Sequence, residues 1–494
     1  LPGDGAPEHI RALTSRHVVT VEADLHHYFA ACASLSGVRA DVSGGGLDET
    51  QLQAVEALAG AHRLVVVEGA AGAGKTATLA ATANILGQNG CQMIVITPTL
   101  KAAQIAGAEV GSRAYSAAWL AHQYGFSWNE DGRWTRHDFL PSPDAELHRG
   151  DLLLIDEAGM LDQDTARALT MIARETGARL ALVGDRHQLP AVGRGGVLDL
   201  AARWAGPEAS VSLDSVHRFA DPEYATLSLA MRSGENPDDV FDQLLQRGQV
   251  VMYPDEVTRT ATLADHAATT GALVVADTRE QVADLNQAVR ERLVADGRVD
   301  DRRTLITQGG ERIGVGDRVA TRRNASEFGV ANRDTWTVTA VDRDRTLHLT
   351  GKAGTRTVPA DYAVHDVELA YASTVYGAQG DTTHTAHLLL GEHTGAASAY
   401  VAMTRGRENN TAHIIADDLN AARQQWILTF ARNRADLGPT HAARIAAQEA
   451  AKYEPYVSPE TLLSRYEADT KPHPISAPNW TPSRESRSGP RIGR

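Results

Sequence analysis

Residues 64–86 read Leu64-Val-Val-Val-Glu-Gly-Ala-Ala-Gly-Ala-Gly-Lys-Thr-Ala-Thr-Leu-Ala-Ala-Thr-Ala-Asn-Ile-Leu86, and this stretch indicates the architecture of the chain. Its valine-rich start predicts a buried strand, and its alanine- and leucine-rich end predicts a helix. Between them, Gly69 to Thr76 matches the pattern G-x-x-x-x-G-K-[ST]. A strand, a glycine-rich loop and a helix in this order are the context that identifies a phosphate-binding loop.

This loop predicts a site for ATP and Mg²⁺. Gly69, Gly72 and Gly74 let backbone N–H groups turn towards phosphate oxygens, and the helix N-terminus adds positive potential. Lys75 is placed to reach the β- and γ-phosphates, and the Thr76 hydroxyl is placed to bind Mg²⁺.

Further short apolar runs alternate with helical stretches along the chain. The first set is Leu64–Glu68, Met93–Thr97, Asp151–Asp156 and Arg179–Gly184, and the second set is Ala272–Ala276, Thr385–Leu390 and Thr411–Ile415. Each run is long enough for a strand and too short for a helix, which is typical of βα units in a parallel sheet. Two separate sets predict two α/β domains.

Polar residues that follow two of these runs are candidates for catalysis. After Leu152–Ile155, Asp156 would hold Mg²⁺, and Glu157 would orient and deprotonate the attacking water. Gln188 follows Arg179–Gly184 and is placed to hydrogen-bond the γ-phosphate or that water. The alternative for Asp156 and Glu157 is that they only stabilise a helix N-terminus. The alternative for Gln188 is a plain surface turn.

Two arginines are candidates for stabilising the transition state of phosphoryl transfer. Arg218 lies in Ser215-Val-His-Arg-Phe219, and Arg405 follows Tyr400-Val-Ala-Met-Thr404. On a second α/β domain facing the first across a cleft, these guanidinium groups would neutralise charge on the γ-phosphate. Closure of the cleft would then convert hydrolysis into motion. The alternative for each arginine is a surface position or an ordinary salt bridge.

Two segments interrupt the α/β pattern. Trp128 and Trp134 flank Asp131-Gly132, a strong turn signal that predicts a β-hairpin. These tryptophans are either packing partners within the hairpin or its working surface. Residues 304–359 contain short, alternating, turn-bounded runs that predict a small antiparallel barrel. Within it, residues 311–356 carry nine Lys or Arg against six Asp or Glu, so they form either solvated strand faces or nucleic-acid contacts.

The composition argues against several classes of protein. The 494 residues carry a net charge of −14, which disfavours a passive nucleic-acid coat, because such a coat needs clustered Lys and Arg. Cys32 and Cys91 are too few for a disulfide framework and lie apart from any zinc-type cluster, so both are expected to be reduced thiols. No apolar run approaches the roughly 18 residues that span a bilayer, and the opening LPGDGAPEHI does not resemble a signal peptide. We therefore expect a cytoplasmic protein without membrane insertion, ending in a mobile proline-rich tail from Pro455.

The ordered series of motifs resembles the helicases of superfamily 1B, the RecD-like branch. More closely, it is similar to the helicase portion of conjugative relaxase-helicases of the TraA/TrwC/TraI type, the MobF family. Eight segments match that family's motifs in order: Leu47–Gln51 (Q motif), Gly69–Thr76 (motif I), Thr97–Gln104 (motif Ia), Leu152–Ala158 (motif II), Leu182–Val192 (motif III), Leu213–Phe219 (motif IV), Tyr371–Thr382 (motif V) and Tyr400–Glu408 (motif VI). Eight motifs in order are far more specific than any one of them.

The resemblance implies two RecA-like domains, with a hairpin called the pin between motifs Ia and II and an SH3-like barrel before motif V. It implies an ATP-dependent, monomeric motor that moves 5′ to 3′ on single-stranded DNA and splits the duplex at the pin. It assigns adenine recognition to Gln51 and nucleotide contact to Gly380. DNA contacts implied by the motifs and the pin are Thr97, Pro98, Thr99, Trp128, Trp134, Thr374 and Gln379.

The expected domain boundaries follow from these motifs. They are a helical lead-in over 1–46, a first RecA-like domain over 47–205 with the pin at about 111–150, the first part of a second RecA-like domain over 206–303, the SH3-like barrel over 304–359, the second part of the second domain over 360–430, and a helical then disordered tail over 431–494.

Two features depart from the family pattern. Tyr376 stands where motif V often carries a histidine, at a position that bears on the coupling of DNA to ATP. A His-x-His cluster with a preceding tyrosine nucleophile, the mark of a relaxase, is missing from the sequence. In a bifunctional transfer protein, the nicking domain is therefore expected upstream of Leu1, and the conjugation machinery becomes an expected partner. The alternatives are a repair-type RecD-like helicase, a helicase-like module that binds single-stranded DNA without ATPase activity, and a P-loop ATPase acting on protein or RNA.

Overall fold

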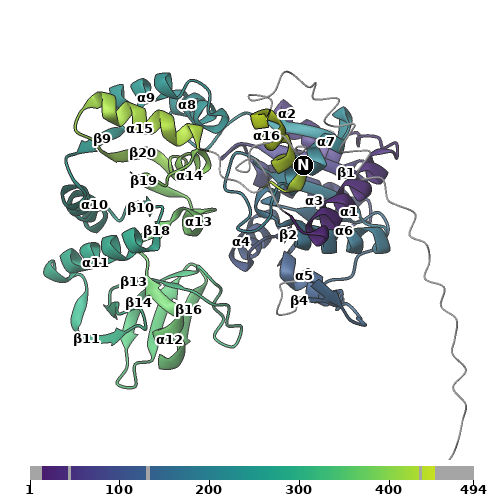
Figure 1. Cartoon of the computed structure of the whole chain (residues 1–494). Coiled ribbons are helices and arrows are strands. Elements are labelled where there is room, and N and C mark those ends of the chain that lie inside the picture. The colour runs from purple at the N-terminus through teal and green to yellow at the C-terminus, as the bar shows by residue number, and fades with distance from the viewer. Residues whose placement is uncertain (1–13, 43–45, 129–133, 433–436, 451–494) are drawn as a thin grey trace, which may run out of the picture. The chain divides into compact units, whose positions relative to one another are not determined.

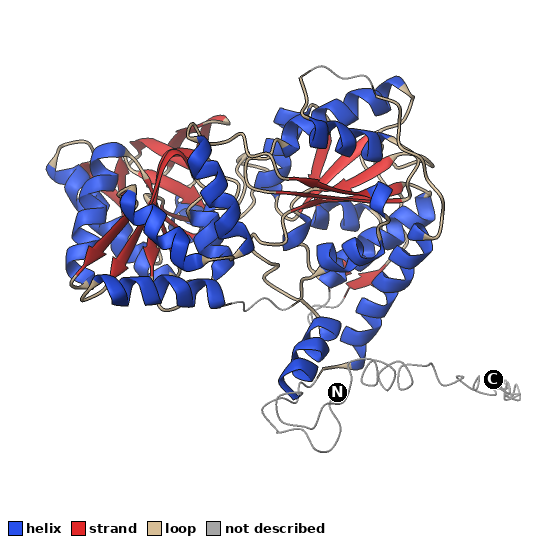
Figure 2. Cartoon of the chain, turned by 90° about the horizontal axis from the view of Figure 1, so that it is seen from above, coloured by secondary structure: helices blue, strands red, loops and turns tan. Residues whose placement is uncertain are grey.

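The computed structural model describes residues 14–42, 46–128, 134–432 and 437–450 (Figure 1). Residues 15–438 form one compact unit, and helix α16 (Pro439–Ala450) falls in another. The first unit contains two parallel sheets with helices on both faces and an additional antiparallel sheet (Figure 2). The predicted Asp131-Gly132 turn and the proline-rich end from Pro455 lie outside the described residues.

The first parallel sheet has six strands and carries the phosphate loop. Its order is β3 (Arg113–Ser116), β2 (Met93–Thr97), β6 (Leu152–Ile155), β7 (Arg179–Gly184), β1 (Leu64–Gly69) and β8 (Ser210–Leu213). All neighbouring pairs are parallel, as predicted for the four runs of the first set.

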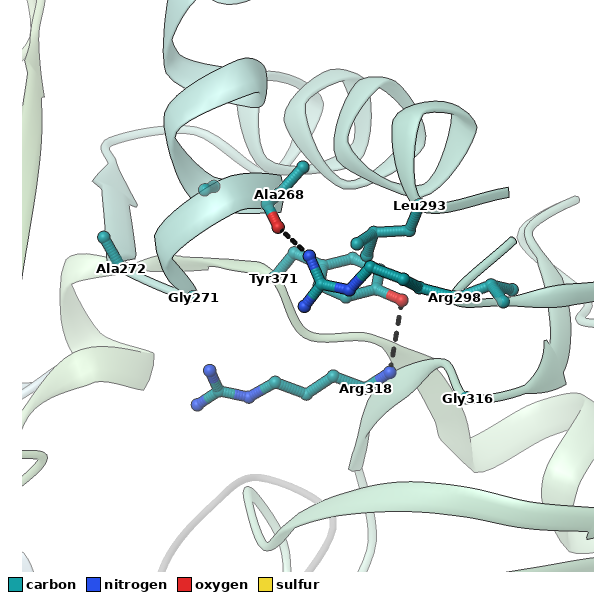
Figure 3. Close-up of a pocket in the computed structure, with 10 residues that line it drawn as sticks. Ala268, Gly271, Ala272, Leu293, Arg298, Gly316, Arg318 and Tyr371 are labelled. Atoms are coloured by element: carbon teal, nitrogen blue, oxygen red, sulfur yellow. Dashed lines mark hydrogen bonds between the residues drawn. The ribbon is translucent and has the colours of Figure 1, made fainter. Parts of the chain in front are cut away.

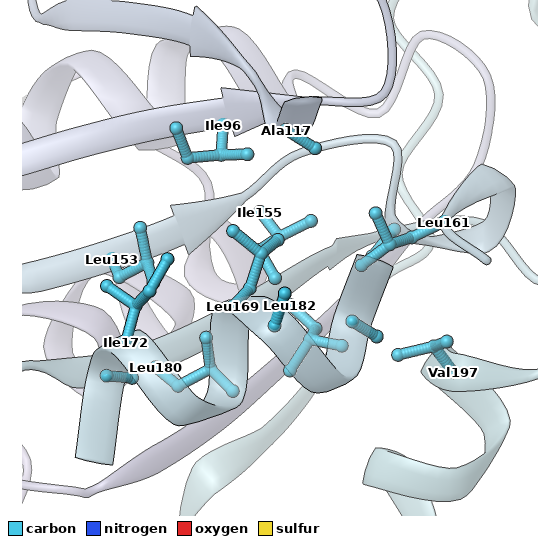
Figure 4. Packing of buried hydrophobic residues seen from close by; sticks show 14 of the residues in the cluster. Ile96, Ala117, Leu153, Ile155, Leu161, Leu169, Ile172, Leu180, Leu182 and Val197 are labelled. Carbon is cyan, nitrogen blue, oxygen red and sulfur yellow. The ribbon is translucent and has the colours of Figure 1, made fainter. Parts of the chain in front are cut away.

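Helices cover both faces of this sheet because its strands are buried on both sides. Residues of α2 (Glu49–Ala59), α3 (Lys75–Gln88) and α4 (Leu100–Val110) form one core cluster with Val65 and Val67. Leu64 and Val66 point to the other face, which is covered by α1 (Arg16–Ala33), α5 (Ala117–Gln123), α6 (Gln163–Thr176) and α7 (Val197–Trp204). Figure 4 shows part of that face, where Leu169 and Ile172 of α6 pack on Leu153, Ile155 and Leu182.

The second parallel sheet has five strands. Its order is β18 (Ala372–Thr374), β10 (Leu273–Ala276), β19 (Thr383–Leu390), β20 (Gly406–Ile415) and β9 (Val250–Tyr253). One face packs against α8 (Pro222–Ser233), α9 (Pro237–Gln246), α14 (Ala396–Ala402) and α15 (Leu419–Ala431), and the other packs against α10 (Glu256–Thr270) and α11 (Arg279–Ala295). The prediction of two parallel α/β sheets is therefore confirmed.

An antiparallel sheet interrupts the second α/β domain. Its order is β16 (Gly354–Val358), β15 (Leu347–Gly351), β14 (Thr335–Val341), β13 (Arg318–Thr321) and β17 (Val367–Leu369), with β11 (Asp300–Ile306) and β12 (Arg312–Val315) paired beside it and α12 (Ala360–Asp366) before β17. The sheet shares one hydrophobic core with α10 and α11. A cavity of about 230 Å³ lies at this junction, lined by Arg298, Arg318 and Tyr371 among others (Figure 3).

Three strands extend the sheets beyond the predicted domain limits. β3 lies inside the interval predicted for the pin, yet it is the parallel edge strand of the first sheet. β8 follows the predicted boundary at residue 205, yet it pairs with β1. The antiparallel sheet likewise continues past Pro359, because β17 pairs with β13. Each of these strands is at a sheet edge, where fewer apolar side chains are needed and the sequence pattern is weaker.

The predicted hairpin is present in the described part of residues 111–150. β4 (Phe126–Trp128) and β5 (Trp134–Arg136) pair antiparallel, with Trp128 opposite Trp134. Cys32 and Cys91 are free thiols, as predicted. A search of the described helices finds none with the length and apolar character needed to cross a membrane.

A buried histidine pair lies in the second α/β domain. The Tyr253 hydroxyl is 2.9 Å from His413 Nδ1, and His413 Nε2 is 2.9 Å from His387 Nδ1. Burial, together with the neighbouring His266 ring, lowers the pKa of His387 to about 4. Burial also lowers the pKa of His413, with a further contribution from His387. The folded state therefore favours neutral imidazoles.

Acidification is expected to destabilise this domain through His387. Its pKa is about 4 in the fold against 6.5 ordinarily, so its contribution to stability is complete above pH 6.5 and is lost as the pH falls towards 4. Between about pH 7.5 and 5, the wild type should lose about 2 kcal/mol of unfolding free energy that His387→Gln does not lose. Urea unfolding at the two pH values measures this difference, with exposed His365→Gln as the control. An identical pH dependence in the wild type and His387→Gln would contradict the assignment.

Candidate nucleotide-binding site

A cavity of about 430 Å³ brings the predicted catalytic residues together. Residues of the first α/β domain that line it include Gly72, Gly74, Lys75, Thr76, Asp156, Glu157 and Gln188. The cavity is also lined by residues that follow the first sheet in the sequence, namely His217, Arg218, Gly380, Thr382, Arg405 and Arg407. Side chains more than 300 residues apart in sequence therefore share one polar cavity.

The phosphate loop is shaped by its glycines. Gly72 and Gly74 have φ values of 84° and 78°, in the left-handed region that favours glycine. A Cβ would lie 2.3 Å from Arg218 Cβ at Gly72 and 2.2 Å from Gln51 Nε2 at Gly74. The buried Gln51 side chain donates to the Ala73 carbonyl over 3.3 Å, so it lies against the loop. The loop thus needs glycine for both its conformation and its close neighbours.

Lys75 and the two carboxylates lie at the carboxyl edge of the first sheet. Lys75 Nζ donates to the Gly69 carbonyl over 2.8 Å. Desolvation and the neighbouring Glu157 charge raise the pKa of Asp156 to about 6, while Lys75 opposes this shift. Glu157 has φ 55°, an uncommon conformation for a side-chain-bearing residue, and its Oε2 accepts a hydrogen bond from Gln379 Nε2 over 3.4 Å. Such local strain is common at functional sites.

The donor set fits a Mg²⁺ ion held mainly by phosphate and water. Asp156 and the Thr76 hydroxyl are hard oxygen donors in the same cavity, and a bound cation would stabilise the ionised form of the Asp156 carboxyl. Among the described residues, no group of three or more His, Cys, Asp or Glu could hold a metal ion. One or two protein oxygens are the usual contribution to a Mg²⁺ site that also contains substrate phosphates.

Two guanidinium groups, the buried Arg405 and the half-buried Arg218, contribute positive charge to the cavity. Arg405 Nε donates to the Val401 carbonyl over 2.8 Å, and Arg218 Nη1 donates to the Thr404 carbonyl over 2.9 Å. In the described part of the chain, neither arginine is ion-paired with a carboxylate. Burial and the neighbouring Arg218 lower the pKa of Arg405 to about 10, and burial lowers the pKa of Arg218. Two uncompensated cations in one cavity favour an anionic ligand.

The position of Arg218 corrects one sequence expectation. Arg218 was expected on the second α/β domain, but it lies in the connection between β8 and α8. The adjacent His217 N–H donates to the Gly72 carbonyl over 2.9 Å, which fixes this connection to the phosphate loop. Of these two arginines, Arg405 is the one that lies at the second sheet, immediately before β20.

Sequence reasoning missed three side chains that join the two α/β domains. The Ala71 N–H donates to the Tyr400 hydroxyl over 2.9 Å, and that hydroxyl lies 3.2 Å from Asp185 Oδ2. Arg232 Nε donates to Asp185 Oδ1 over 3.0 Å. The available signal was the location of Tyr400 and Asp185 inside motifs VI and III, whereas Arg232 has no motif to mark it.

Motif V contacts the first α/β domain at further points. The Tyr376 hydroxyl donates to the Pro190 carbonyl over 3.3 Å, so the residue that departs from the family pattern contacts motif III. Lys101 of α4 forms an ion pair with Asp381, with Nζ 2.7 Å from Oδ1. The backbone carbonyl of Asp381 accepts from Arg405 Nη1 over 3.3 Å. Motif V therefore connects α4 with the arginine of the cavity.

The predicted DNA contacts of motifs Ia and V differ in accessibility. Thr97 is 1% exposed and its hydroxyl donates to the Thr99 carbonyl, so its side chain stabilises the loop. Pro98 is half-buried, and Thr99 is exposed and accepts from the Ala102 N–H at the start of α4. Thr374 caps α13 (Val375–Ala378) by accepting from the Gly377 N–H. Gln379 contacts Glu157, so its side chain lies beside the nucleotide cavity.

The two hairpin tryptophans have different environments. Their ring centroids are 3.8 Å apart, but Trp128 is 51% exposed, whereas Trp134 packs against the core cluster of the first domain. Arg136 anchors the hairpin through paired hydrogen bonds to Glu175. Trp134 therefore has a packing role, whereas Trp128 provides the exposed aromatic surface of the hairpin.

Comparisons with known proteins agree with this geometry. Residues 46–255 match the family described as an AAA domain. The probable conjugal transfer protein TraA of Sinorhizobium fredii is 27% identical over 414 residues, which cover 80% of this chain and 36% of that protein. The ATP-dependent RecD2 DNA helicase of Deinococcus radiodurans is 38% identical over 176 residues, covering 35% of this chain and 22% of that protein. The chain spans about a third of the length of the TraA proteins that it matches.

The fold resembles that of solved Pif1 structures. Bacteroides Pif1 bound to single-stranded DNA has a TM-score of 0.53 and 18% identity, covering 83% of this chain and 98% of that one. Pif1 helicase from Candida albicans has a TM-score of 0.51 and 17% identity, covering 83% and 100%. These likenesses show a RecA-like helicase fold. The ordered motifs and the likenesses to TraA and RecD2 agree with the resemblance of this chain to the superfamily 1B helicases.

Proposed function

We propose that the chain is an ATP-dependent DNA helicase that translocates 5′ to 3′ on single-stranded DNA. The observation that carries this proposal is the cavity in which the phosphate loop of the first α/β domain faces Arg405 of the second. A nucleotide held between two such domains can draw them together, and its hydrolysis can release them. The TraA and RecD2 relatives support DNA as the track.

The cavity residues have distinct roles in this proposal. Lys75 and the loop N–H groups bind the phosphates, and Gln51, which lies against the phosphate loop, recognises adenine. Bound Mg²⁺, held by Asp156 and Thr76, would neutralise phosphate charge. Glu157 accepts the proton of the attacking water, Gln188 orients that water or the γ-phosphate, and Arg218 and Arg405 stabilise the transition state.

The biological setting proposed is the motor part of a conjugative relaxase. The TraA match covers most of this chain and about a third of the TraA protein, so an upstream nicking domain and the conjugation machinery are consistent partners. In this setting the chain acts in the cytoplasm as a monomeric motor on single-stranded DNA and on the junction with duplex. In this proposal the β4–β5 hairpin acts as the pin, and the antiparallel sheet takes the part of the SH3-like barrel. The alternative is that the chain is a repair-type RecD-like helicase. The similarity to RecD2 supports this alternative and extends over 35% of the chain.

Strand displacement on tailed duplexes tests the proposed activity. Duplexes with a 5′ single-stranded tail should be unwound in the presence of ATP and Mg²⁺, whereas those with a 3′ tail should remain paired. The same tails made of RNA distinguish DNA from RNA as the track. Unwinding of the 3′-tailed duplex alone would overturn the proposed polarity, and unwinding only on RNA tails would overturn the proposed track.

Trp128→Ala is expected to reduce unwinding more than ATP hydrolysis. Its exposed ring lies on the hairpin, where a wedge would meet the duplex, and the nucleotide cavity does not include it. Rates of strand displacement and DNA-stimulated ATP hydrolysis should be measured side by side, with Trp204→Ala, another partly exposed tryptophan, as the control. Equal losses of both rates in Trp128→Ala would mean that the residue is structural.

A further inference from the structure

Three arginines converge on a small cavity where the second parallel sheet meets the antiparallel sheet. The cavity has a volume of about 80 Å³, and its charged lining residues are Arg279, Arg322, Arg333, Glu311 and Glu368. Ser373 and Thr374, at the end of β18, add two hydroxyl groups to the lining. The site lies at the carboxyl ends of β10 and β18, the edge at which parallel sheets commonly bind ligands.

Each arginine is positioned by a different element. Arg279 is the first residue of α11 and is exposed. The Arg322 N–H, just after β13, donates to the Asp366 carbonyl over 2.7 Å. Arg333 has φ 73°, and its N–H donates to the Thr321 carbonyl over 2.6 Å. Its guanidinium lies against motif V, because a Cβ on Gly377 would be 2.7 Å from Arg333 Nη1.

Few carboxylates neutralise the positive charge of the three guanidinium groups. Glu368 Oε1 is 2.9 Å from Arg322 Nη1 and 3.7 Å from Arg333 Nη1. Glu311 accepts a hydrogen bond from the Leu369 N–H, and burial with nearby Glu368 raises its pKa to about 7. In the parts of the chain that the structure places, Arg279 has no ion pair. Burial and the neighbouring Arg322 lower the pKa of Arg333, as expected for crowded cations.

We propose that Arg279, Arg322 and Arg333 bind one phosphodiester group of single-stranded DNA, and that Glu368 competes with this phosphate for Arg322 and Arg333. The cavity admits a phosphate-sized group but is too small for a nucleoside, which favours a backbone whose bases stay outside. Planar guanidinium forks suit phosphate oxygens, and the Thr374 hydroxyl belongs to the same lining. This assignment rests on the proposed function, because it names residues that hold the translocating strand.

The Glu368 carboxylate, which already lies in the site, limits the affinity of the site for phosphate. Glu368 already satisfies Arg322, so an entering phosphate replaces one charge-assisted interaction with another. The gain on binding is therefore smaller than at a pair of unpartnered arginines. A site of this kind releases the strand readily, as a stepping motor requires.

The binding of oligo(dT) to the complete chain tests this proposal. Fluorescence anisotropy should be measured without ATP over a series of salt concentrations, with thermal unfolding as the check on folding. The variants are Arg279→Gln, the double variant Arg279→Gln/Arg333→Gln, and Glu368→Gln. The matched control is Arg302→Gln, because Arg302 is a 91% exposed arginine of β11 that pairs only with Asp300 among described residues.

The double variant should bind oligo(dT) about tenfold more weakly and lower the salt slope by about 0.7, which corresponds to the loss of the one phosphate contact at this site. Arg279→Gln alone, at an exposed position, should lower the slope by less than the double variant does, because Arg322 and Arg333 still contact the same phosphate. Glu368→Gln should bind more tightly than the wild type, and Arg302→Gln should match the wild type.

Wild-type affinity and slope in both arginine variants would overturn the site while leaving the proposed helicase function intact. A Glu368→Gln variant that binds no more tightly would overturn the competition. Absence of oligo(dT) binding by the wild type would overturn the proposed function itself and this site with it. Thermal stabilisation by millimolar inorganic phosphate that is lost in the double variant, while oligo(dT) binding stays at the wild-type level, would assign the cavity to the free ion and contradict a DNA site.

Discussion

Replacement of Lys75 by alanine should lower ATP hydrolysis by about 100-fold or more. Lys75 Nζ is the cation at the phosphate loop, and it contacts the Gly69 carbonyl beside the cavity. Its removal takes away a charge that would follow the β- and γ-phosphates as negative charge develops. Steady-state phosphate release in the presence of oligo(dT) measures the loss.

Binding of single-stranded DNA should persist in Lys75→Ala, since the predicted DNA contacts lie outside the phosphate loop. Lys352→Ala is a suitable control, because Lys352 is an exposed lysine in the turn between β15 and β16. Hydrolysis at the wild-type rate in Lys75→Ala would mean that this cavity is not the ATPase site.

Replacement of Glu157 by glutamine should slow hydrolysis by about 10²–10⁴-fold while ATP remains bound. Glutamine keeps an oxygen that accepts from Gln379 Nε2, so the local geometry is retained, but it cannot take a proton from water. Rapid filtration with labelled ATP should show a trapped nucleotide, and single-turnover kinetics should show slow cleavage.

Glu223→Gln provides the control for Glu157→Gln, because Glu223 is a largely exposed carboxylate at the start of α8. Simultaneous loss of ATP binding and hydrolysis in Glu157→Gln would indicate a structural role for Glu157. Unchanged turnover would exclude it as the base.

The sequence predicted structure best where a few neighbouring residues carry the signal for burial or for a motif. The valines of β1 and the glycines at 72 and 74 predicted a strand and a phosphate loop, because a strand buried on both faces is continuously apolar and the left-handed turn needs glycine. The polar edge strand β3 did not carry that signal, and β8 lay beyond the motif that set the domain boundary.

Contacts between distant segments were beyond the reach of sequence patterns. The hydrogen bonds of Tyr400 to Ala71 and Asp185, and the Lys101–Asp381 ion pair, depend on how the two α/β domains meet. The same limit applies to Gln379, which was assigned to DNA but lies beside Glu157. Local patterns identify which residues belong to a motif, but tertiary packing determines what each side chain contacts.

The domain contacts suggest how DNA and nucleotide are coupled. Motif V contacts Glu157 through Gln379, motif III through Tyr376 and α4 through Asp381. In the proposed function, a strand held near Thr374 would therefore act on Glu157, the proposed base, through a few residues of motif V. In this account the Tyr376 phenol contributes a hydrogen bond to Pro190 at the position where the family often has histidine.

The rate of ATP hydrolysis by the wild-type chain, measured with and without oligo(dT), tests the central claim most directly. If the two α/β domains close around ATP and single-stranded DNA controls that closure through motif V, the rate of hydrolysis should rise severalfold or more as oligo(dT) saturates the protein. A chain that binds oligo(dT) yet hydrolyses ATP no faster, or not at all, would be a DNA-binding module and would contradict the motor.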